Sequence, residues 1–239
     1  MRQVPTLETT LFGIVGDGRV ARHFSHYLEL LGLPFSAWSR RRAGPPPPEA
    51  LDGCRTVLLL VSDAAIVPFV EAWPELRAKR LVHFSGSLVT PVAECAHPLM
   101  TFGPDLYDLE TYRRIPFAVD EGGSALGDLL PGLPNPSFVI AADDRPYYHA
   151  LCAMAGNFTT ILWQKLFTEF ERRLGVAPPL AHPYLARVAA NLAVDAPRAL
   201  TGPLARGDAA AVSRHLRALE GDPFHDVYAA FVRAYDERD

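Results

Sequence analysis

The sequence predicts an α/β protein: a doubly wound, mainly parallel sheet over residues 1–143, followed by a smaller, all-helical domain over residues 144–239. Two observations predict this organisation. Between residues 11 and 140, short apolar runs alternate with helix-like segments, as in parallel sheets whose strands are joined by right-handed crossovers. After Asp143 the strand-like runs stop, and stretches with helical periodicity follow, separated by breaks rich in glycine and proline.

The expected strands are apolar runs that end where a turn or a helical pattern begins. They lie within residues 11–16, 34–39, 56–63, 81–87, 115–120 and 137–143. Helical spacing of apolar residues follows the first run as far as Gly32, and residues 64–73 form another expected helix. Residues 44–50 are rich in proline and predict a loop. The expected helices of the second half lie within residues 144–174, 179–200, 208–219 and 223–235.

Charge and composition argue against several classes of protein. The chain has 23 Lys and Arg against 27 Asp and Glu, a net charge of −4, so nucleic acid is not an expected partner. No apolar run approaches the ~20 residues that span a bilayer, and residues 1–12 have no signal-peptide pattern. The 3 cysteines form no CxxC pair, which favours reduced thiols and a cytoplasmic protein. No histidine or carboxylate spacing predicts a metal.

Residues 16–21 read Gly-Asp-Gly-Arg-Val-Ala, a GxGxxA sequence between the first expected strand and the first expected helix. Here the first glycine permits a tight turn, the second leaves room for a pyrophosphate, and the alanine lets the helix lie close to the sheet. The helix N-terminus offers unpaired N–H groups to the phosphates. We therefore expect a dinucleotide site rather than an ordinary glycine turn, formed by Gly16, Asp17, Gly18, Arg19 and Val20.

The end of the second expected strand indicates which dinucleotide binds. NAD sites usually place a carboxylate there, which accepts hydrogen bonds from the ribose hydroxyl. This chain instead has Ser39, Arg40 and Arg41, whose hydroxyl and guanidinium groups suit a 2′-phosphate. The sequence thus favours NADP(H), with NAD(H) as the alternative, although such a run of charges can also be a solvated loop.

Polar residues also follow two later strands, where ligands of open α/β sheets bind. Ser62 and Asp63 follow the third expected strand, where Asp63 can face the nicotinamide ribose, act as a helix N-cap, or do both. Ser85 and Gly86 follow the fourth, where they either contact cofactor and substrate or only form a turn.

Three stretches of the chain resemble a known family. They are residues 83–87 (His-Phe-Ser-Gly-Ser), 96–102 (Ala-His-Pro-Leu-Met-Thr-Phe) and 200–208 (Leu-Thr-Gly-Pro-Leu-Ala-Arg-Gly-Asp). They are similar to predicted oxidoreductases with a Rossmann-like N-terminal domain and a helical C-terminal domain of unknown function. These proteins are distant relatives of 6-phosphogluconate dehydrogenase, ketopantoate reductase and pyrroline-5-carboxylate reductase. The resemblance implies NAD(P) binding and a homodimer built through the helical half.

Hydride transfer to a carbonyl or imine requires a positioned acceptor and a proton source. His97 is the expected proton donor, because histidine titrates near neutral pH and this one lies in a loop after a short expected strand. Alternatively, His97 has no role beyond capping the turn at Pro98. Ser85 is a second catalytic candidate, since its Ser-Gly and the later His-Pro are weakly similar to prephenate dehydrogenases, in which a serine and a histidine handle a hydroxyl proton.

The helical half holds two further candidates. Asn157 begins a polar stripe on an otherwise apolar expected helix, facing solvent or a cleft, and the resemblance to reductases implies that it contacts substrate. Lys165 lies four residues before Glu169, so a surface ion pair is expected there. Arg206 is a candidate for binding a substrate carboxylate, whereas Asp208 is expected to cap the following helix, which accounts for much of this motif.

The leading functional hypothesis is an NADP(H)-dependent oxidoreductase acting on a small oxo or imino acid, in the first place a ketopantoate-like 2-oxo acid. The alternative is a dinucleotide-binding sensor or assembly protein that has lost catalysis. The expected partners are a small-molecule substrate and a second copy of the chain, with neither nucleic acid nor membrane.

Overall fold

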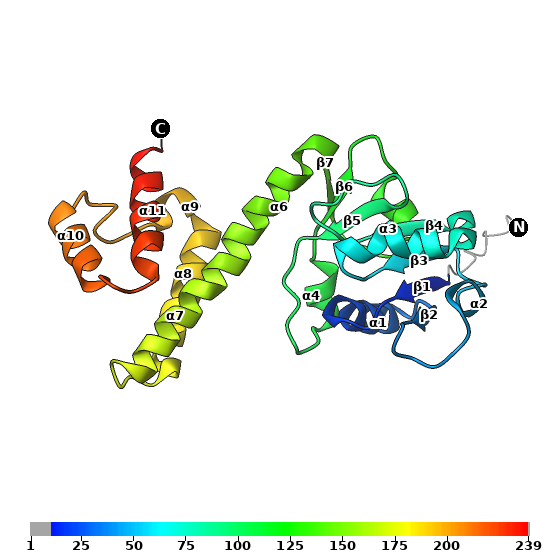
Figure 1. Cartoon of the computed structure of the whole chain (residues 1–239), viewed down its shortest axis with the longest axis horizontal. Helices are drawn as coiled ribbons and strands as arrows, with labels where there is room; N and C mark the ends of the chain where they lie inside the picture. Colours follow the sequence, from blue (N-terminus) through cyan, green and yellow to red (C-terminus); the bar gives the residue numbers. More distant parts are fainter. Residues whose placement is uncertain (1–10, 239) are drawn as a thin grey trace, which may run out of the picture. The chain divides into compact units, whose positions relative to one another are not determined.

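The computed structural model describes residues 11–238 and divides the chain into two compact units, which meet between Ile161 and Leu162. The first unit carries a sheet with helices and the second is helical (Figure 1), so the predicted fold class is confirmed. Residues 1–10, on which the signal-peptide prediction falls, and residue 239 lie outside the described residues. The domain boundary that the sequence predicts, between residues 143 and 144, lies just after the last strand. The boundary between the two compact units lies further along the chain, because the helix that follows this strand packs against the sheet.

The first unit is built on a seven-stranded sheet. Its strands are β1 (Phe12–Val15), β2 (Phe35–Trp38), β3 (Thr56–Leu59), β4 (Arg80–His83), β5 (Glu94–Pro98), β6 (Phe117–Asp120) and β7 (Ser137–Ile140). They lie in the order β2-β1-β3-β4-β5-β6-β7, and the described strands pair in parallel except β5 with β6. The chain places β2 on one side of β1 and β3 on the other. The order of the strands therefore reverses between β1 and β3, which is where open α/β sheets bind their ligands.

Side chains of the strands alternate between two apolar cores, one on each face of the sheet. Ile14 and Leu58 point into one core, while Val15 and Leu59 point into the other. The first core also holds buried residues of α1 (Arg19–Leu31), α4 (Leu109–Arg113) and α5 (Leu126–Leu129). The second holds those of α3 (Asp63–Ala72) and η1 (Pro74–Ala78). Because both faces are covered, every residue of the β1 and β3 strands is buried, and nearly all of them are apolar.

The strand predictions are confirmed, with shorter bounds than the apolar runs. No range was predicted for β5, although residues 96–98 of the His-Pro stretch lie within it. The prediction of a loop at residues 44–50 is wrong at its end, where α2 (Pro47–Ala50) forms one helical turn. Proline fits the first positions of a helix because the N–H that it lacks would have no partner there.

After β7 the chain is helical, as predicted. The elements are η2 (Ala142–Asp144), α6 (Arg145–Ala153), the π-helical segment η3 (Met154–Phe158), α7 (Thr159–Arg172), η4 (Pro178–Ala181), α8 (His182–Val194), α9 (Ala196–Ala199), α10 (Ala209–Ala218) and α11 (Phe224–Asp236). Asp208 caps α10 by accepting a hydrogen bond from the Ala211 N–H, which confirms the predicted cap. The predicted ion pair of Lys165 with Glu169 is also present, at 3.0 Å.

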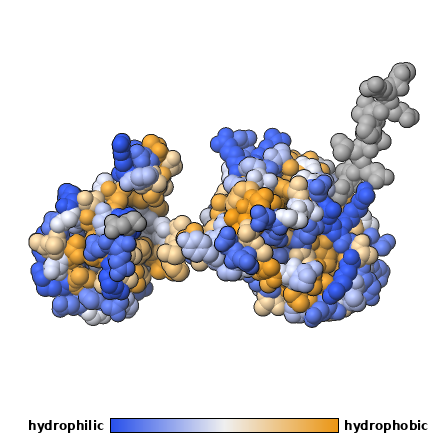
Figure 2. Space-filling model, turned by 90° about the horizontal axis from the view of Figure 1, so that it is seen from above, coloured by the Kyte–Doolittle hydropathy of each residue, from blue (hydrophilic) through white to orange (hydrophobic). Residues whose placement is uncertain are grey.

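The helical unit buries little of its apolar surface. Within its described part, Ala181 and Ala211 are the buried apolar residues. Large apolar side chains are exposed instead, and Figure 2 shows such residues in orange on this unit. They include Leu174, Leu180, Tyr184, Leu192, Val194, Leu200 and Phe231. Over residues 11–238, the structure contains no helix with the length and apolar character of a membrane span.

Candidate functional site

The turn between β1 and α1 has the geometry that the GxGxxA sequence predicts. Gly16 has a φ of 128°, and a Cβ at this position would collide with the carbonyl oxygen of Leu60. A Cβ on Gly18 would instead meet nothing within 4 Å, so the space in front of this residue is open. Ala21 is 2% exposed and packs into the first core. The three small residues thus shape the turn, leave space before it, and seat the helix on the sheet.

The N-terminus of α1 is free of charged or polar caps from the described side chains. Gly18 is the N-cap in an extended conformation, makes no side-chain cap hydrogen bond, and the first turn contains no acidic residue. The N–H groups of this turn and the positive end of the helix dipole are therefore available to an anion. Asp17 lies just before the helix, with one carboxylate oxygen 3.8 Å from the exposed Arg41 guanidinium.

The end of β2 lies beside this turn, because the Gly16 N–H donates to the Trp38 carbonyl at 2.9 Å. Ser39 follows Trp38 and is 4% exposed, yet its hydroxyl has no hydrogen-bond partner among the described residues. Arg40 and Arg41 come next and are exposed. Buried hydroxyls without a partner are rare in proteins, so the Ser39 hydroxyl indicates a place where a polar ligand group completes the structure.

Asp63 and Ser85 are joined at the carboxyl ends of β3 and β4. The Ser85 hydroxyl donates to the Asp63 carboxylate at 2.5 Å and accepts from the backbone N–H groups of residues 87 and 88. The N-cap alternative for Asp63 is wrong, since α3 is preceded by Ser62 and has no side-chain cap. Because a hydroxyl has one proton, the Ser85 proton is already used by Asp63, and Ser85 positions that carboxylate.

His97 lies inside β5, not in the loop that the sequence predicted after a short strand. Its Nδ1 atom is 2.9 Å from the hydroxyl of Tyr148 on α6, and its ring centroid is 5.6 Å from that of His149. Burial, with smaller effects of the charges of His149 and Arg145, lowers the pKa of His97 to about 4. This histidine is therefore neutral at physiological pH, so the expectation that it titrates near pH 7 is wrong.

Helix α6 comes close to the end of β4. Gly86 is buried, and a Cβ at this position would collide with the ring of His149. The absence of a side chain at Gly86 therefore allows α6 to lie close to the end of β4, next to Ser85.

A buried ion pair attaches α6 to the sheet. Arg145 is 0% exposed, and its guanidinium contacts the Asp120 carboxylate at 2.7 Å and the Ala118 carbonyl at 3.4 Å. Its Nη1 atom is buried without a partner among the described residues. His83 lies in β4, and burial lowers its pKa to about 4, while the charge of Asp120 acts in the opposite direction and that of Arg145 in the same direction with a smaller effect. Burial is therefore what disfavours protonation of this histidine.

Two further predicted site residues have exposed side chains. Asn157 lies in the π-helical segment η3, and its side chain is exposed. Segments of this kind often occur at functional sites. Arg206 belongs to the second unit, where its side chain is exposed in the turn before α10. In contrast, sequence reasoning missed Tyr148, His149 and Arg145, because no spacing in the chain links them to β4, β5 or β6.

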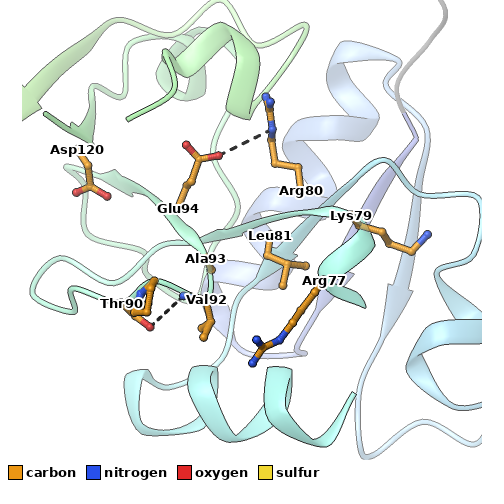
Figure 3. Close-up of a pocket in the computed structure, with 10 residues that line it drawn as sticks. Arg77, Lys79, Arg80, Leu81, Thr90, Val92, Ala93, Glu94 and Asp120 are labelled. Atoms are coloured by element: carbon orange, nitrogen blue, oxygen red, sulfur yellow. Dashed lines mark hydrogen bonds and ion pairs between the residues drawn. The ribbon is translucent and has the colours of Figure 1, made fainter. Parts of the chain in front are cut away.

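A pocket of about 460 Å³ borders the first residues of β4 and β5, away from the glycine turn (Figure 3). Two of its three basic residues are engaged by the chain itself. Lys79 donates to the carbonyls of residues 52 and 54, and Arg80 donates to the carbonyl of residue 128 and lies 4.0 Å from Glu94. No group of three potential metal ligands occurs within residues 11–238.

Comparisons with known proteins agree with this architecture. The domain of unknown function DUF2520 matches residues 118–235. A solved structure of a "putative NADP oxidoreductase" from Bacteroides fragilis is 20% identical, covers 98% of this chain and 100% of its own, and has a TM-score of 0.76. Protein TM1727 from Thermotoga maritima is 22% identical, with coverage of 95% and 97% and a TM-score of 0.66.

A pyrroline carboxylate reductase from Plasmodium falciparum, solved with NADP bound, is 14% identical, covers 95% of this chain and 96% of its own, and has a TM-score of 0.57. No curated protein matches the sequence. At these identities the solved structures establish the fold. The resemblance inferred from the sequence is therefore confirmed: the chain combines a Rossmann-like N-terminal part with a C-terminal part, residues 118–235, that matches the domain of unknown function DUF2520.

Proposed function

We propose that this protein is an NADP(H)-dependent oxidoreductase that transfers a hydride to or from a small oxo or imino acid, such as a ketopantoate-like 2-oxo acid. One observation carries the proposal. At the point where the strand order reverses, an uncapped helix N-terminus faces open space in front of Gly18, beside the unpartnered hydroxyl of Ser39. This combination suits a diphosphate next to a further phosphate group.

The residues present fit NADP(H). The N–H groups of residues 18–20 would bind the diphosphate, and Ser39, Arg40 and Arg41 would bind the 2′-phosphate. No carboxylate stands at residues 39–42, where one would favour the ribose of NAD(H). When bound, the dinucleotide would supply or accept the hydride. Two of the compared structures are named as an NADP oxidoreductase and as a reductase with NADP bound, which supports the same cofactor here.

The substrate would bind near the carboxyl ends of β4 and β5. His97 is the group that we expect to hydrogen-bond the oxygen or nitrogen of the acceptor, and the hydrogen bond from Ser85 holds the Asp63 carboxylate nearby. Asn157 and Arg206 are further proposed substrate contacts, and Arg206 would bind a carboxylate of the substrate. The exposed apolar side chains of the helical unit support the proposal of a homodimer. The 3 free cysteines agree with the proposed cytoplasmic location.

Oxidation of NADPH by the full chain, followed against a panel of 2-oxo acids and cyclic imines, tests the proposal. At least one compound should give saturable turnover, and His97→Gln should reduce kcat. His225→Gln is the matched control, because His225 contacts the adjacent Asp226 in the helical unit. Tight NADPH binding without turnover on any compound would instead favour the sensor or assembly function.

A further inference from the structure

Tyr148 is the nearest polar partner of His97 that the structure shows, and it lies on α6, 51 residues along the chain. We propose that Tyr148 is a positioning residue that holds His97 as the tautomer protonated at Nε2, and that this N–H polarises the carbonyl or imine of the substrate. The statement about the tautomer concerns the protein alone. The statement about the substrate rests on the proposed function.

The two rings are held in a defined geometry. The Tyr148 hydroxyl lies 2.9 Å from Nδ1 of His97, and the rings meet edge-on, with centroids 5.6 Å apart at 83°. On another side, the Tyr148 ring packs against Phe138 of β7, with centroids 6.0 Å apart. His97 is fixed within β5, where it pairs with Ala118 of β6. Packing on both partners thus keeps the hydroxyl directed at Nδ1.

The direction of this hydrogen bond follows from the acceptors available. The hydroxyl of Tyr148 has one proton. Burial raises the pKa of this hydroxyl, and the sulfur of Cys152, one turn further along α6, is a competing acceptor that raises it further. An imidazole nitrogen is a stronger acceptor than a thiol sulfur, so the hydroxyl donates to Nδ1 and the thiol can donate weakly to the phenol oxygen. A neutral imidazole carries one proton. With Nδ1 accepting, that proton is on Nε2.

The surroundings of His97 keep the ring neutral. His97 is half-buried in β5, its ring lies edge-on to that of His149, and the charge of Arg145 opposes its protonation. The carboxylate of Asp63 favours protonation, but its effect is smaller than these. An imidazolium is therefore disfavoured, and the ring can act as a neutral hydrogen-bond donor. No proton has to leave His97 in this role.

The tautomer can be measured without substrate or cofactor. Long-range proton–nitrogen NMR correlations of the full chain distinguish the two neutral tautomers, and the His97 signals are identified by their loss in His97→Gln. We expect the Nε2–H pattern in the wild type at neutral pH. In Tyr148→Phe, which lacks the hydroxyl, the pattern should shift toward a mixture of tautomers. Tyr147→Phe is the matched control and should leave it unchanged, because Tyr147 is 68% exposed.

Two results would overturn the inference. One is an Nδ1–H pattern in the wild type, which would mean that His97 donates to Tyr148 and that Tyr148 donates to Cys152. The other is an unchanged pattern in Tyr148→Phe, with the fold shown intact by thermal unfolding. Neither result depends on catalysis, so the failure of this inference is distinct from the failure of the proposed oxidoreductase function.

Turnover provides a second readout. If a substrate is found, Tyr148→Phe should lower kcat by about tenfold, as expected for one lost neutral hydrogen bond, and leave the KM for NADPH unchanged. An unchanged kcat in a variant whose tautomer has shifted would overturn the part of the inference that concerns the substrate.

Discussion

At the scale of single residues, two glycines of the same turn have different tasks. Gly16 is required by its φ of 128° and by the Leu60 carbonyl, so its role is in the fold. Gly18 has free space before it, so its role is toward whatever binds there. The glycine spacing already predicts these two tasks, and the structure shows the geometry behind each of them.

This difference gives a paired prediction. Gly16→Ala should lower the free energy of unfolding by about 1–3 kcal/mol, because the side chain meets backbone in a conformation that L residues rarely adopt. Gly18→Ala should change stability by less than about 0.5 kcal/mol but weaken NADPH binding, because the methyl group occupies the space for the diphosphate. Urea unfolding and calorimetric titration measure the two effects. Equal loss of stability in both variants would contradict the assignment.

His83 makes the fold sensitive to acid. It is 1% exposed, and burial lowers its pKa from the ordinary 6.5 to about 4. As the pH falls below 6.5, the unfolded chain binds a proton at this residue while the folded chain does not until about pH 4, so folding loses stability across that window. The loss from His83 amounts to at most about 3 kcal/mol, and His97 acts in the same direction.

Urea unfolding near neutral pH and at about pH 5 tests this prediction. The wild type should be less stable at the lower pH, and His83→Gln should show a weaker dependence than the wild type. If the free energy of unfolding depends on pH with the same slope in both proteins, groups other than His83 cause that dependence.

At the scale of elements, the pair of Arg145 and Asp120 joins α6 to β6. Arg145 is fully buried, whereas the Asp120 side chain is 36% exposed. The two partners should therefore respond differently to mutation. Asp120→Asn leaves a buried guanidinium without its counter-charge and should cost about 3–5 kcal/mol of stability. Arg145→Met leaves a carboxylate that can reach water and should cost less. Equal losses, measured by urea unfolding, would contradict this account.

The elements also show what a sequence can and cannot predict. The β1–α1 turn and the run at residues 56–63 were predictable because their signals, glycine spacing and apolar character, are local in the chain. The contact of His97 with Tyr148 and that of Asp120 with Arg145 were not, since they join positions 51 and 25 residues apart. Strand β5 lacked a clear signal because histidine and proline interrupt its apolar pattern.

At the scale of the whole molecule, the exposed apolar residues of the helical unit predict self-association. Two buried apolar residues among the described residues of this unit are few for the core of a unit that is stable alone. We expect the chain to sediment as a dimer, with twice the mass of 26.2 kDa. Analytical ultracentrifugation at micromolar concentration measures this directly. A monomer under these conditions would contradict the proposed homodimer while leaving the dinucleotide site untouched.

We propose that the open turn at Gly18 and the strand end at Ser39 together bind a phosphorylated pyridine dinucleotide. Isothermal titration calorimetry of the intact wild-type chain with NADPH and, separately, with NADH measures this binding. We expect saturable binding of one NADPH per chain and weaker binding of NADH, because Arg40 and Arg41 have a 2′-phosphate to bind only in NADPH. Absence of saturable binding for both dinucleotides would contradict the claim, and equal affinities would contradict the role given to the end of β2.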